Sequence, residues 1–458
     1  MSSSREYPGT FDEVIESPPI ERQRKSRVNG NGDAGDQTIS VADFYAHMPT
    51  HRYIFAPCRQ QWPARSVNAR LGFVDGIPAS HWLDQNRHVE QMTWAPGQPM
   101  LIEDRLISEG GWIVKPGCRI FNLYRPANIR LGDPNRIEPW LDHLHRIYPD
   151  DAEHISRWLT HRVQNPAEKI NHVLLLGGSQ GIGKDTLLEP IKYAVGPWNF
   201  TEVSPTHMFG RFNGFVRSVI LRISEARDLG DVNRFAFYEH MKIYSAAPPD
   251  VLRCDEKNLR EYSVPNVCGV IITTNHKTDG IYLPADDRRH YVAWSDATKE
   301  DFTPDYWTSI YRWYEDEGYR NVAAYLTQVD LAGFNAKAPP RTTVAFHAIV
   351  DANRAPEDAE LADTLDEIAK GGRRVTAVTI PMLVAAATGD FLPWLLDRKN
   401  RRVIPYRLES AGYVQVRNDA AQDGLWKISG KRQVIYARND LSAADRLKAA
   451  RQIVEGGQ

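Results

Sequence analysis

One glycine-rich stretch decides the fold of this chain, and it reads Gly178-Ser179-Gln180-Gly181-Ile182-Gly183-Lys184-Asp185-Thr186. An apolar run at 173–176 precedes it, and a helical pattern at 187–195 follows. Strand, glycine loop and helix form the setting in which backbone N–H groups and a helix N-terminus converge on an anion. The stretch matches the P-loop pattern G-x-x-x-x-G-K-[ST] except at the last position, where Asp185 replaces the hydroxyl residue. It therefore predicts that the chain binds ATP, with the loop and Lys184 holding the phosphates.

Bulk properties indicate an ordinary globular protein rather than a disulfide-rich or membrane one. The chain has 458 residues, a formal net charge of -2 and four scattered cysteines without a C-x-x-C pair. That cysteine pattern argues against a zinc site or a disulfide framework. No apolar run approaches the roughly 20 residues that span a bilayer, and the N-terminus lacks the apolar core of a signal peptide. We expect a cytoplasmic protein with no membrane partner.

Composition and hydrophobic periodicity divide the chain into six segments. They are a disordered tail (1–40), an accessory, partly β region (41–135), a helical collar (136–169), an ATPase core (170–335), a linker (336–356) and a winged-helix-like domain (357–458). The collar segment shows two amphipathic stripes, for which simple packing against the core is the alternative to a role in oligomerisation. The predicted class is α/β.

Three further motifs follow the P-loop in order. A β-branched apolar run ends in Ser224 and Glu225, and a second one ends in Asn275. In P-loop ATPases a glutamate after the second strand polarises the attacking water, and Glu225 fits that role. Asn275 fits the role of a residue that contacts both the γ-phosphate and the attacking water. Arg288 and Arg289 precede a third run, and either one fits an arginine finger for a neighbouring subunit. The plain alternatives are a strand-end acid, a turn-forming amide and a solvated charge run.

These motifs together resemble those of superfamily 3 helicases, and most closely the helicase part of phage and prophage primase-helicases. The resemblance rests on the glycine loop, Ser-Glu-Ala-Arg-Asp at 224–228, Thr-Thr-Asn-His-Lys at 273–277 and Asp-Asp-Arg-Arg-His at 286–290. It implies an AAA+-like core that works as a hexameric ring on single-stranded DNA. It also implies a lysine-bearing hairpin that faces the pore. Lys257 is the first candidate there, with Arg253 and Arg260 as seconds, although nearby acids weaken the argument from charge.

The magnesium site departs from the family pattern. The usual site takes a hydroxyl from the P-loop and a carboxylate from the second strand. Here the P-loop position holds the carboxylate of Asp185, and the strand position holds the hydroxyl of Ser224. Thr186 is a weak substitute for the missing P-loop hydroxyl, because successive helix residues point about 100° apart. We therefore expect Asp185 to bind Mg²⁺ with help from Ser224. The alternative is that Asp185 only caps the helix.

The C-terminal segment combines helices, a basic stretch and a β-hairpin, which suggests a winged helix on DNA. The expected contacts are basic side chains of the helical stretch and the wing, namely Arg398, Lys399, Arg401, Arg402, Lys431 and Arg432. Pro405 is awkward for a continuous recognition helix. A protein-binding winged helix is the alternative.

The sequence thus predicts a Mg²⁺-dependent, ATP-driven DNA helicase of phage or prophage replication, with a primase or other replisome protein as a further partner. A DNA-binding initiator or loader ATPase that does not translocate is one alternative. A small-molecule phosphotransferase is another, but it leaves Lys257, the collar and the C-terminal segment unexplained. The sequence does not separate these activities.

Overall fold

The computed structural model describes residues 39–224, 234–277, 280–352, 356–369, 372, 375–389 and 391–456. The expected N-terminal tail lies outside these residues except for its last two positions, and so does Glu225. Among the described residues, no helix is long and apolar enough to cross a membrane. The four cysteines are free thiols.

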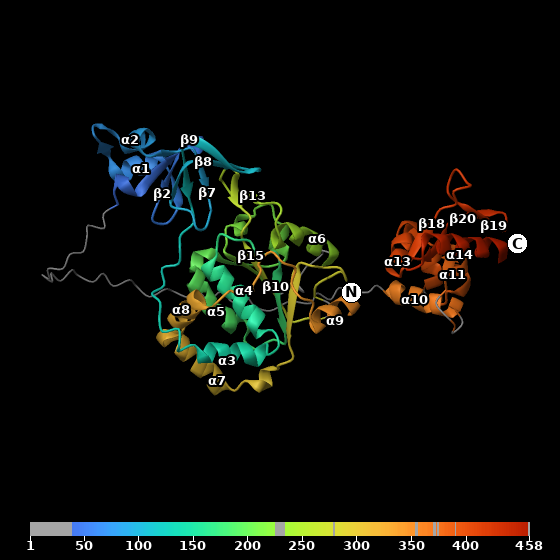
Figure 1. Ribbon diagram of the computed structural model, residues 1–458. Helices are drawn as coiled ribbons and strands as arrows, with labels where there is room; N and C mark the ends of the chain where they lie inside the picture. The colour runs from blue at the N-terminus through green and yellow to red at the C-terminus, as the bar shows by residue number, and fades with distance from the viewer. Residues whose placement is uncertain are drawn as a thin grey trace, which may run out of the picture.

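A five-stranded parallel sheet forms the centre of the molecule (Figure 1). Its strand order is β11-β12-β15-β10-β16. The strands are β10 (Val173–Gly178), β11 (Phe200–Val203), β12 (Ile220–Ile223), β15 (Gly269–Thr274) and β16 (His290–Ser295). Both faces of β10 and β15 are buried, as continuous apolar runs predict for a parallel sheet covered by helices. The α/β class expected from the sequence is confirmed.

Helices cover this sheet and share one hydrophobic core with it. They are α3 (Glu138–Ile147), α4 (Ala152–Gln164), α5 (Lys184–Val195), α6 (Arg234–Ser245), α7 (Pro304–Trp313), α8 (Tyr319–Gln328) and α9 (Val344–Ala352). A π-helical turn, Tyr314–Gly318, joins α7 to α8. Parallel strands end at the same edge, so the glycine loop, Ser224 and Asn275 meet there.

The expected collar and the expected linker both contribute residues to the main core. The apolar stripes of α3 and α4 pack into it, where Trp140 and Trp158 are fully buried. The expected linker contains α9, whose Phe346 and Ile349 join the same core. Thr343 just before α9 donates a hydrogen bond to the carbonyl of Val292 at 2.6 Å, which ties this segment to β16.

The N-terminal region contains two small sheets. The first has the order β3-β2-β1-β6 and the second β7-β9-β8. The strands are β1 (Phe44–His47), β2 (Arg52–Phe55), β3 (Gln60–Pro63), β6 (His88–Val89), β7 (Gln91–Thr93), β8 (Leu101–Ser108) and β9 (Gly111–Asn122). The remaining elements are α1 (Ala64–Leu71), the pair β4 (Phe73–Val74) and β5 (Ile77–Pro78), and α2 (Ala79–Asn86).

The N-terminal region packs against a hairpin of the core, made of β13 (Val251–Cys254) and β14 (Tyr262–Pro265). Figure 1 shows β13 reaching toward β7, β8 and β9. The Thr93 hydroxyl donates to the carbonyl of Ser263 at 2.8 Å, and Val251 packs on the apolar cluster around Ile102. Arg253 forms an ion pair with Glu109. The expected accessory region is therefore joined to the hairpin that carries Lys257.

The C-terminal residues form hydrophobic clusters of their own. The elements are α10 (Pro356–Ala369), β17 (Ala377–Thr379), α11 (Ile380–Ala386), α12 (Phe391–Leu396), α13 (Ile404–Ser410), β18 (Tyr413–Val416), β19 (Trp426–Ile428), β20 (Lys431–Gln433), β21 (Ile435–Arg438) and α14 (Ala443–Gly456). β17, β21 and β18 form an antiparallel sheet, and β19 pairs with β20.

Candidate active site

The glycine loop connects the end of β10 to the first turn of α5. Gly178, Gly181 and Gly183 have φ values of 146°, 85° and 89°, which side chains with a Cβ rarely adopt. A Cβ on Gly183 would lie 2.6 Å from the rings of His143 and Trp307. The loop therefore needs these glycines both for its backbone path and for its close packing.

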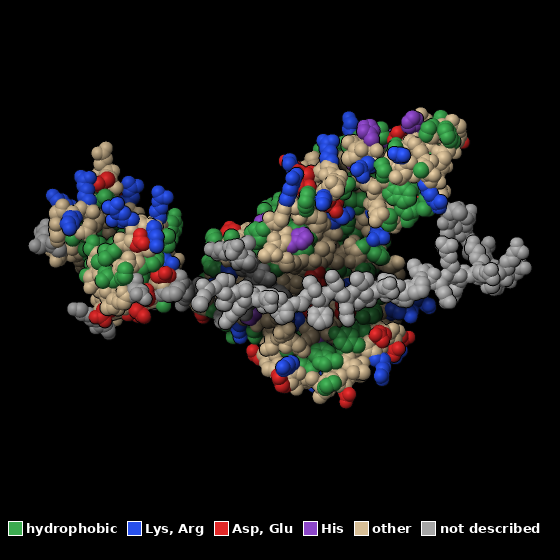
Figure 2. Space-filling view, turned by 180° about the vertical axis from the view of Figure 1, so that it is seen from behind, with side chains coloured by type: hydrophobic (Ala, Val, Ile, Leu, Met, Phe, Trp, Pro, Cys, Tyr) green, Lys and Arg blue, Asp and Glu red, His purple; other side chains and the backbone are tan. Residues whose placement is uncertain are grey.

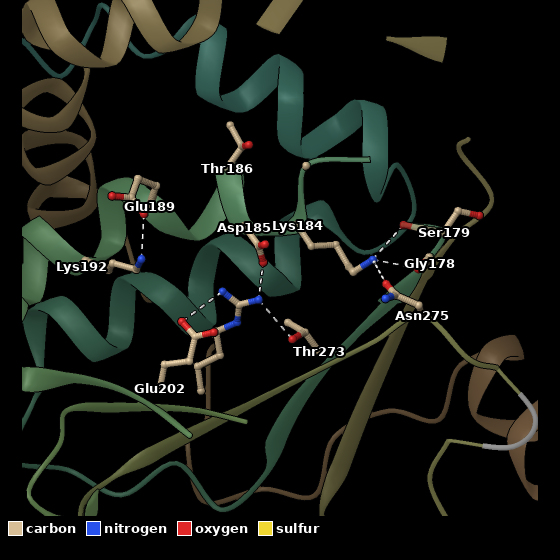
Figure 3. Close-up of polar contacts among 12 residues, drawn as sticks. Gly178, Ser179, Lys184, Asp185, Thr186, Glu189, Lys192, Glu202, Thr273 and Asn275 are labelled. Atoms are coloured by element: carbon tan, nitrogen blue, oxygen red, sulfur yellow. Dashed lines mark hydrogen bonds and ion pairs between the residues drawn. The ribbon is translucent and has the colours of Figure 1, made fainter. Parts of the chain in front are cut away.

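Lys184 lies at the centre of the site and points along the loop (Figure 3). Its amine donates hydrogen bonds to the carbonyls of Gly178 at 2.8 Å and Ser179 at 2.9 Å, and to Asn275 Oδ1 at 2.7 Å. Burial lowers the pKa of this amine to about 8, an effect that Asp185 opposes and Arg222 strengthens. The site thus holds a cation in a poorly solvated position, where an anion would compensate it.

Asp185 is paired with Arg222, a residue that the sequence analysis did not single out. The Arg222 guanidinium forms an ion pair with the Asp185 carboxylate and donates to the Thr273 hydroxyl at 3.3 Å. Glu202 lies 3.6 Å from another guanidinium nitrogen. The Arg222 side chain is 7% exposed whereas that of Asp185 is 76% exposed. Arg222 is thus buried in the fold, whereas most of the Asp185 side chain is exposed to solvent.

Thr186 faces α7 and not the loop. Its hydroxyl lies 2.9 Å from the Tyr311 hydroxyl, and its carbonyl accepts a hydrogen bond from Tyr314. His143 of α3 bonds the carbonyl of Gly183 through Nε2 at 2.9 Å, so this nitrogen carries the proton. Burial also lowers the pKa of His143, which favours the neutral ring. The start of α5 is therefore held from two sides by α3 and α7.

A cavity of about 380 Å³ opens over the loop. The described residues that line it are Gln180, Gly181, Gly183, Lys184, Asp185, Thr186, Glu202, Arg222, Ser224, Thr273, Thr274, Asn275, Trp307 and Tyr311. Ser224 and Asn275 are therefore brought to the loop from β12 and β15, as expected from parallel strands. Polar and charged groups of the sheet form one wall, and two aromatic rings of α7 form another.

The donor set at this cavity fits a metal ion only together with phosphate oxygens. Among the described residues, no group of three or more His, Cys, Asp or Glu is placed to hold an ion. Asp185, Ser224 and Thr186 all line the cavity, and the Thr186 hydroxyl also contacts that of Tyr311. The three metal candidates read from the sequence are therefore brought to the same cavity.

Arg288 and Arg289 lie far from the loop of their own chain. They precede β16, whose first residues pair with the start of β10, as Val173 pairs with His290. The six residues of β10 span about 20 Å, so these arginines lie at the opposite edge of the sheet. Arg288 is exposed and Arg289 is partly exposed. They can act on a neighbouring chain but not on the cavity of their own.

The candidate DNA contacts lie at two places. Lys257, Arg253 and Arg260 are exposed on and beside the β13–β14 hairpin, where Arg253 is paired with Glu109. In the C-terminal unit, Arg398, Lys399, Arg401 and Arg402 lie on a 3-10 turn, and Lys431 and Arg432 lie on β20. Figure 2 shows Lys and Arg side chains gathered at one end of this unit. The basic segment is helical in two pieces, the 3-10 turn and α13, which begins at Ile404 with Pro405 in its first turn.

Comparisons with known proteins give a family model that matches part of the chain, and a similar fold. A model described as a family of unknown function (DUF5906) matches residues 175–289, about a quarter of the chain. That stretch contains the glycine loop, Arg222, Lys257 and Asn275. No curated protein matches the chain significantly.

Solved structures of the C-terminal region of NrS-1 are similar to this chain. An apo structure has 15% identity and a TM-score of 0.61, and it covers 86% of this chain and 95% of that chain. Two A-form apo structures have 14% and 16% identity, TM-scores of 0.58 and 0.57, and cover 86% of this chain and 96% of theirs. At this identity the likeness concerns the fold, and it extends well beyond the central sheet.

Proposed function

We propose that the chain is a Mg²⁺-dependent ATPase that works as a DNA helicase in phage or prophage replication. The observation that carries the proposal is the Lys184–Asn275 contact of 2.7 Å across the mouth of the glycine loop. It joins the phosphate-binding lysine of β10–α5 to the polar residue at the end of β15. A γ-phosphate bound at the loop would lie within reach of both groups, which suits a phosphate-binding lysine and a residue that positions the attacking water.

The residues around the cavity support distinct roles in hydrolysis. The loop amides and Lys184 hold the β- and γ-phosphates, and Asn275 positions the attacking water. Asp185 and Ser224 would hold Mg²⁺, which neutralises charge on the phosphates when it is bound. Arg222 keeps the Asp185 carboxylate beside the cavity through their ion pair. Glu225 remains the proposed activator of water on the basis of the sequence pattern.

A ring explains where the arginines lie. Arg288 and Arg289 are at the opposite edge of the sheet from the loop, and an arginine that stabilises the transition state must reach the γ-phosphate. In a hexameric ring, this edge of one subunit would face the cavity of the next. A monomeric phosphotransferase gives these two residues no task.

The proposed helicase would move along DNA. Lys257, on the exposed loop of the β13–β14 hairpin, would bind a phosphate of single-stranded DNA. The basic end of the C-terminal unit would bind duplex or single-stranded DNA. The contact between this hairpin and the N-terminal region links strand movement to a part of the chain that can recruit a primase or another replisome protein. The resemblance of the motifs to phage primase-helicases supports the place in replication.

Strand displacement on a forked DNA tests the proposal. The full chain with ATP and Mg²⁺ should separate the strands, and Lys184→Ala should abolish both hydrolysis and separation. Hydrolysis without separation would favour an initiator or loader. A monomer in size-exclusion chromatography with ATP and single-stranded DNA, together with hydrolysis that ignores DNA, would favour a phosphotransferase.

A further inference from the structure

The aromatic wall of the cavity has no task in the chemistry described above. Trp307 and Tyr311 are four residues apart on α7, so their side chains lie on the same face of that helix. Both line the cavity over the glycine loop. They are the only described residues of α7 that do so, and neither is charged.

The direction of the phosphate chain places these rings on the nucleoside side. Lys184 points toward Ser179 and Asn275 and away from Thr186 (Figure 3), so the γ-phosphate end lies toward Asn275. The α-phosphate then lies toward the first amides of α5, where Thr186 contacts Tyr311 at 2.9 Å. A nucleoside attached to that phosphate leaves the loop beside α7.

The indole of Trp307 is fixed before any ligand arrives. Its ring centroid lies 5.1 Å from that of Phe302 and 5.2 Å from that of Tyr306, and its edge packs over Gly183. A rigid aromatic face beside a phosphate site loses little conformational entropy when a flat ligand stacks on it. The Tyr311 hydroxyl lies 2.9 Å from the Thr186 hydroxyl, and the face of an aromatic ring stacks on any base without reading its hydrogen-bond pattern.

We propose that Trp307 and Tyr311 form a stacking platform for the base of the nucleotide, and that this platform makes the site accept purine nucleotides in general. The proposal rests on the proposed function, because it assumes that phosphates occupy the glycine loop. Stacking depends on ring area and not on hydrogen-bond pattern, so ATP and GTP should bind alike and UTP more weakly.

Binding measurements with three ligands separate the platform from the loop. The ligands are ATP, GTP and inorganic tripolyphosphate, which has the phosphates but no base. Trp307→Leu should lower the affinity for ATP about 10-fold, which is within the range for loss of one stacking ring. The affinity for tripolyphosphate should change by less than about 2-fold. Trp307→Phe should recover part of the loss. Trp313→Leu is the matched control, because Trp313 is a tryptophan of the same helix that does not line the cavity.

The outcomes are distinct. A selective loss of ATP and GTP affinity supports the platform. Equal loss of ATP and tripolyphosphate affinity would overturn it, because Trp307 would then act only by shaping Gly183, and unchanged affinity for both would overturn it as well. If the unmodified protein bound neither ligand, the proposed function itself would fail.

Discussion

Binding of ATP is predicted to take up a proton at Lys184. Burial lowers the pKa of this amine to about 8 in the free protein, so about half of the amines are uncharged at pH 8. Phosphate oxygens beside the amine favour its charged form and raise its pKa in the complex. Binding should therefore take up about half a proton at pH 8 and about a tenth of a proton at pH 7.

The same shift in the pKa of Lys184 determines how the affinity for ATP depends on pH. The affinity for ATP is full below the pKa of the free protein, where the amine is already charged. It falls as the pH rises through 8, by up to about tenfold per pH unit, until the pKa of the complex is reached. The ligand does not contribute to this change, because a terminal phosphate with a pKa of about 6 is ionised throughout the range.

Isothermal titration calorimetry measures the proton directly. A non-hydrolysable ATP analogue is titrated at pH 7, 8 and 9 in buffers that differ in ionisation enthalpy, with Mg²⁺ held constant. Lys184→Arg is the control, because a guanidinium stays charged over this range and should remove the uptake. If Lys184→Arg does not bind, Lys184→Gln serves instead. An affinity that is constant from pH 7 to 9, or equal proton uptake in the control, would refute the reasoning.

Three further predictions concern single residues. Gly183→Ala should destabilise the fold by at least about 1 kcal/mol more than Gly333→Ala. Both glycines have a positive φ, but only at Gly183 would a Cβ meet neighbouring rings. Equal free energies of unfolding for the two variants in urea would contradict this. Asp185→Ala should reduce Mg²⁺-dependent hydrolysis strongly while costing at most about 1 kcal/mol of stability, because the carboxylate is mostly exposed; wild-type activity would remove its metal role. Lys257→Ala should weaken single-stranded DNA binding and lower its salt slope by about one, with ATP affinity unchanged, and should do so more than Arg253→Ala, whose guanidinium is held by an ion pair. The reverse order in a fluorescence anisotropy titration would argue against the hairpin contact.

Much of the centre of the fold could be predicted from local sequence. The runs that became β10 and β15 are apolar on both faces, which only a covered parallel sheet satisfies. The glycines of the loop and Lys184 followed the pattern that phosphate binding imposes on the backbone. The meeting of Asn275 with Lys184 followed from the shared edge of parallel strands.

The partners supplied by distant segments could not be predicted. Arg222 interrupts an apolar run and gives no sign of its contact with Asp185, which is 37 positions away. Trp307 and Tyr311 show ordinary helical spacing, and only the packing of α7 over α5 brings them to the cavity. The stripes of α3 and α4 indicated burial but not which surface buries them.

The C-terminal strands show a limit of a different kind. Gln433 pairs with Trp426 in the hairpin, whereas Ile435, two residues on, pairs with Val416 in the sheet. The chain changes partners at Val434. Register against two different strands depends on tertiary packing and leaves no local pattern.

Mixing two inactive variants tests the central claim, which is that the loop of one subunit and the arginines of the next form one ATPase site. Lys184→Ala removes the loop cation, and the double variant Arg288→Ala/Arg289→Ala removes the edge arginines. Each alone should fail to hydrolyse ATP in the presence of single-stranded DNA, and an equimolar mixture should regain part of the wild-type rate. A mixture no more active than the sum of its parts, beside an active wild type, would contradict the shared site.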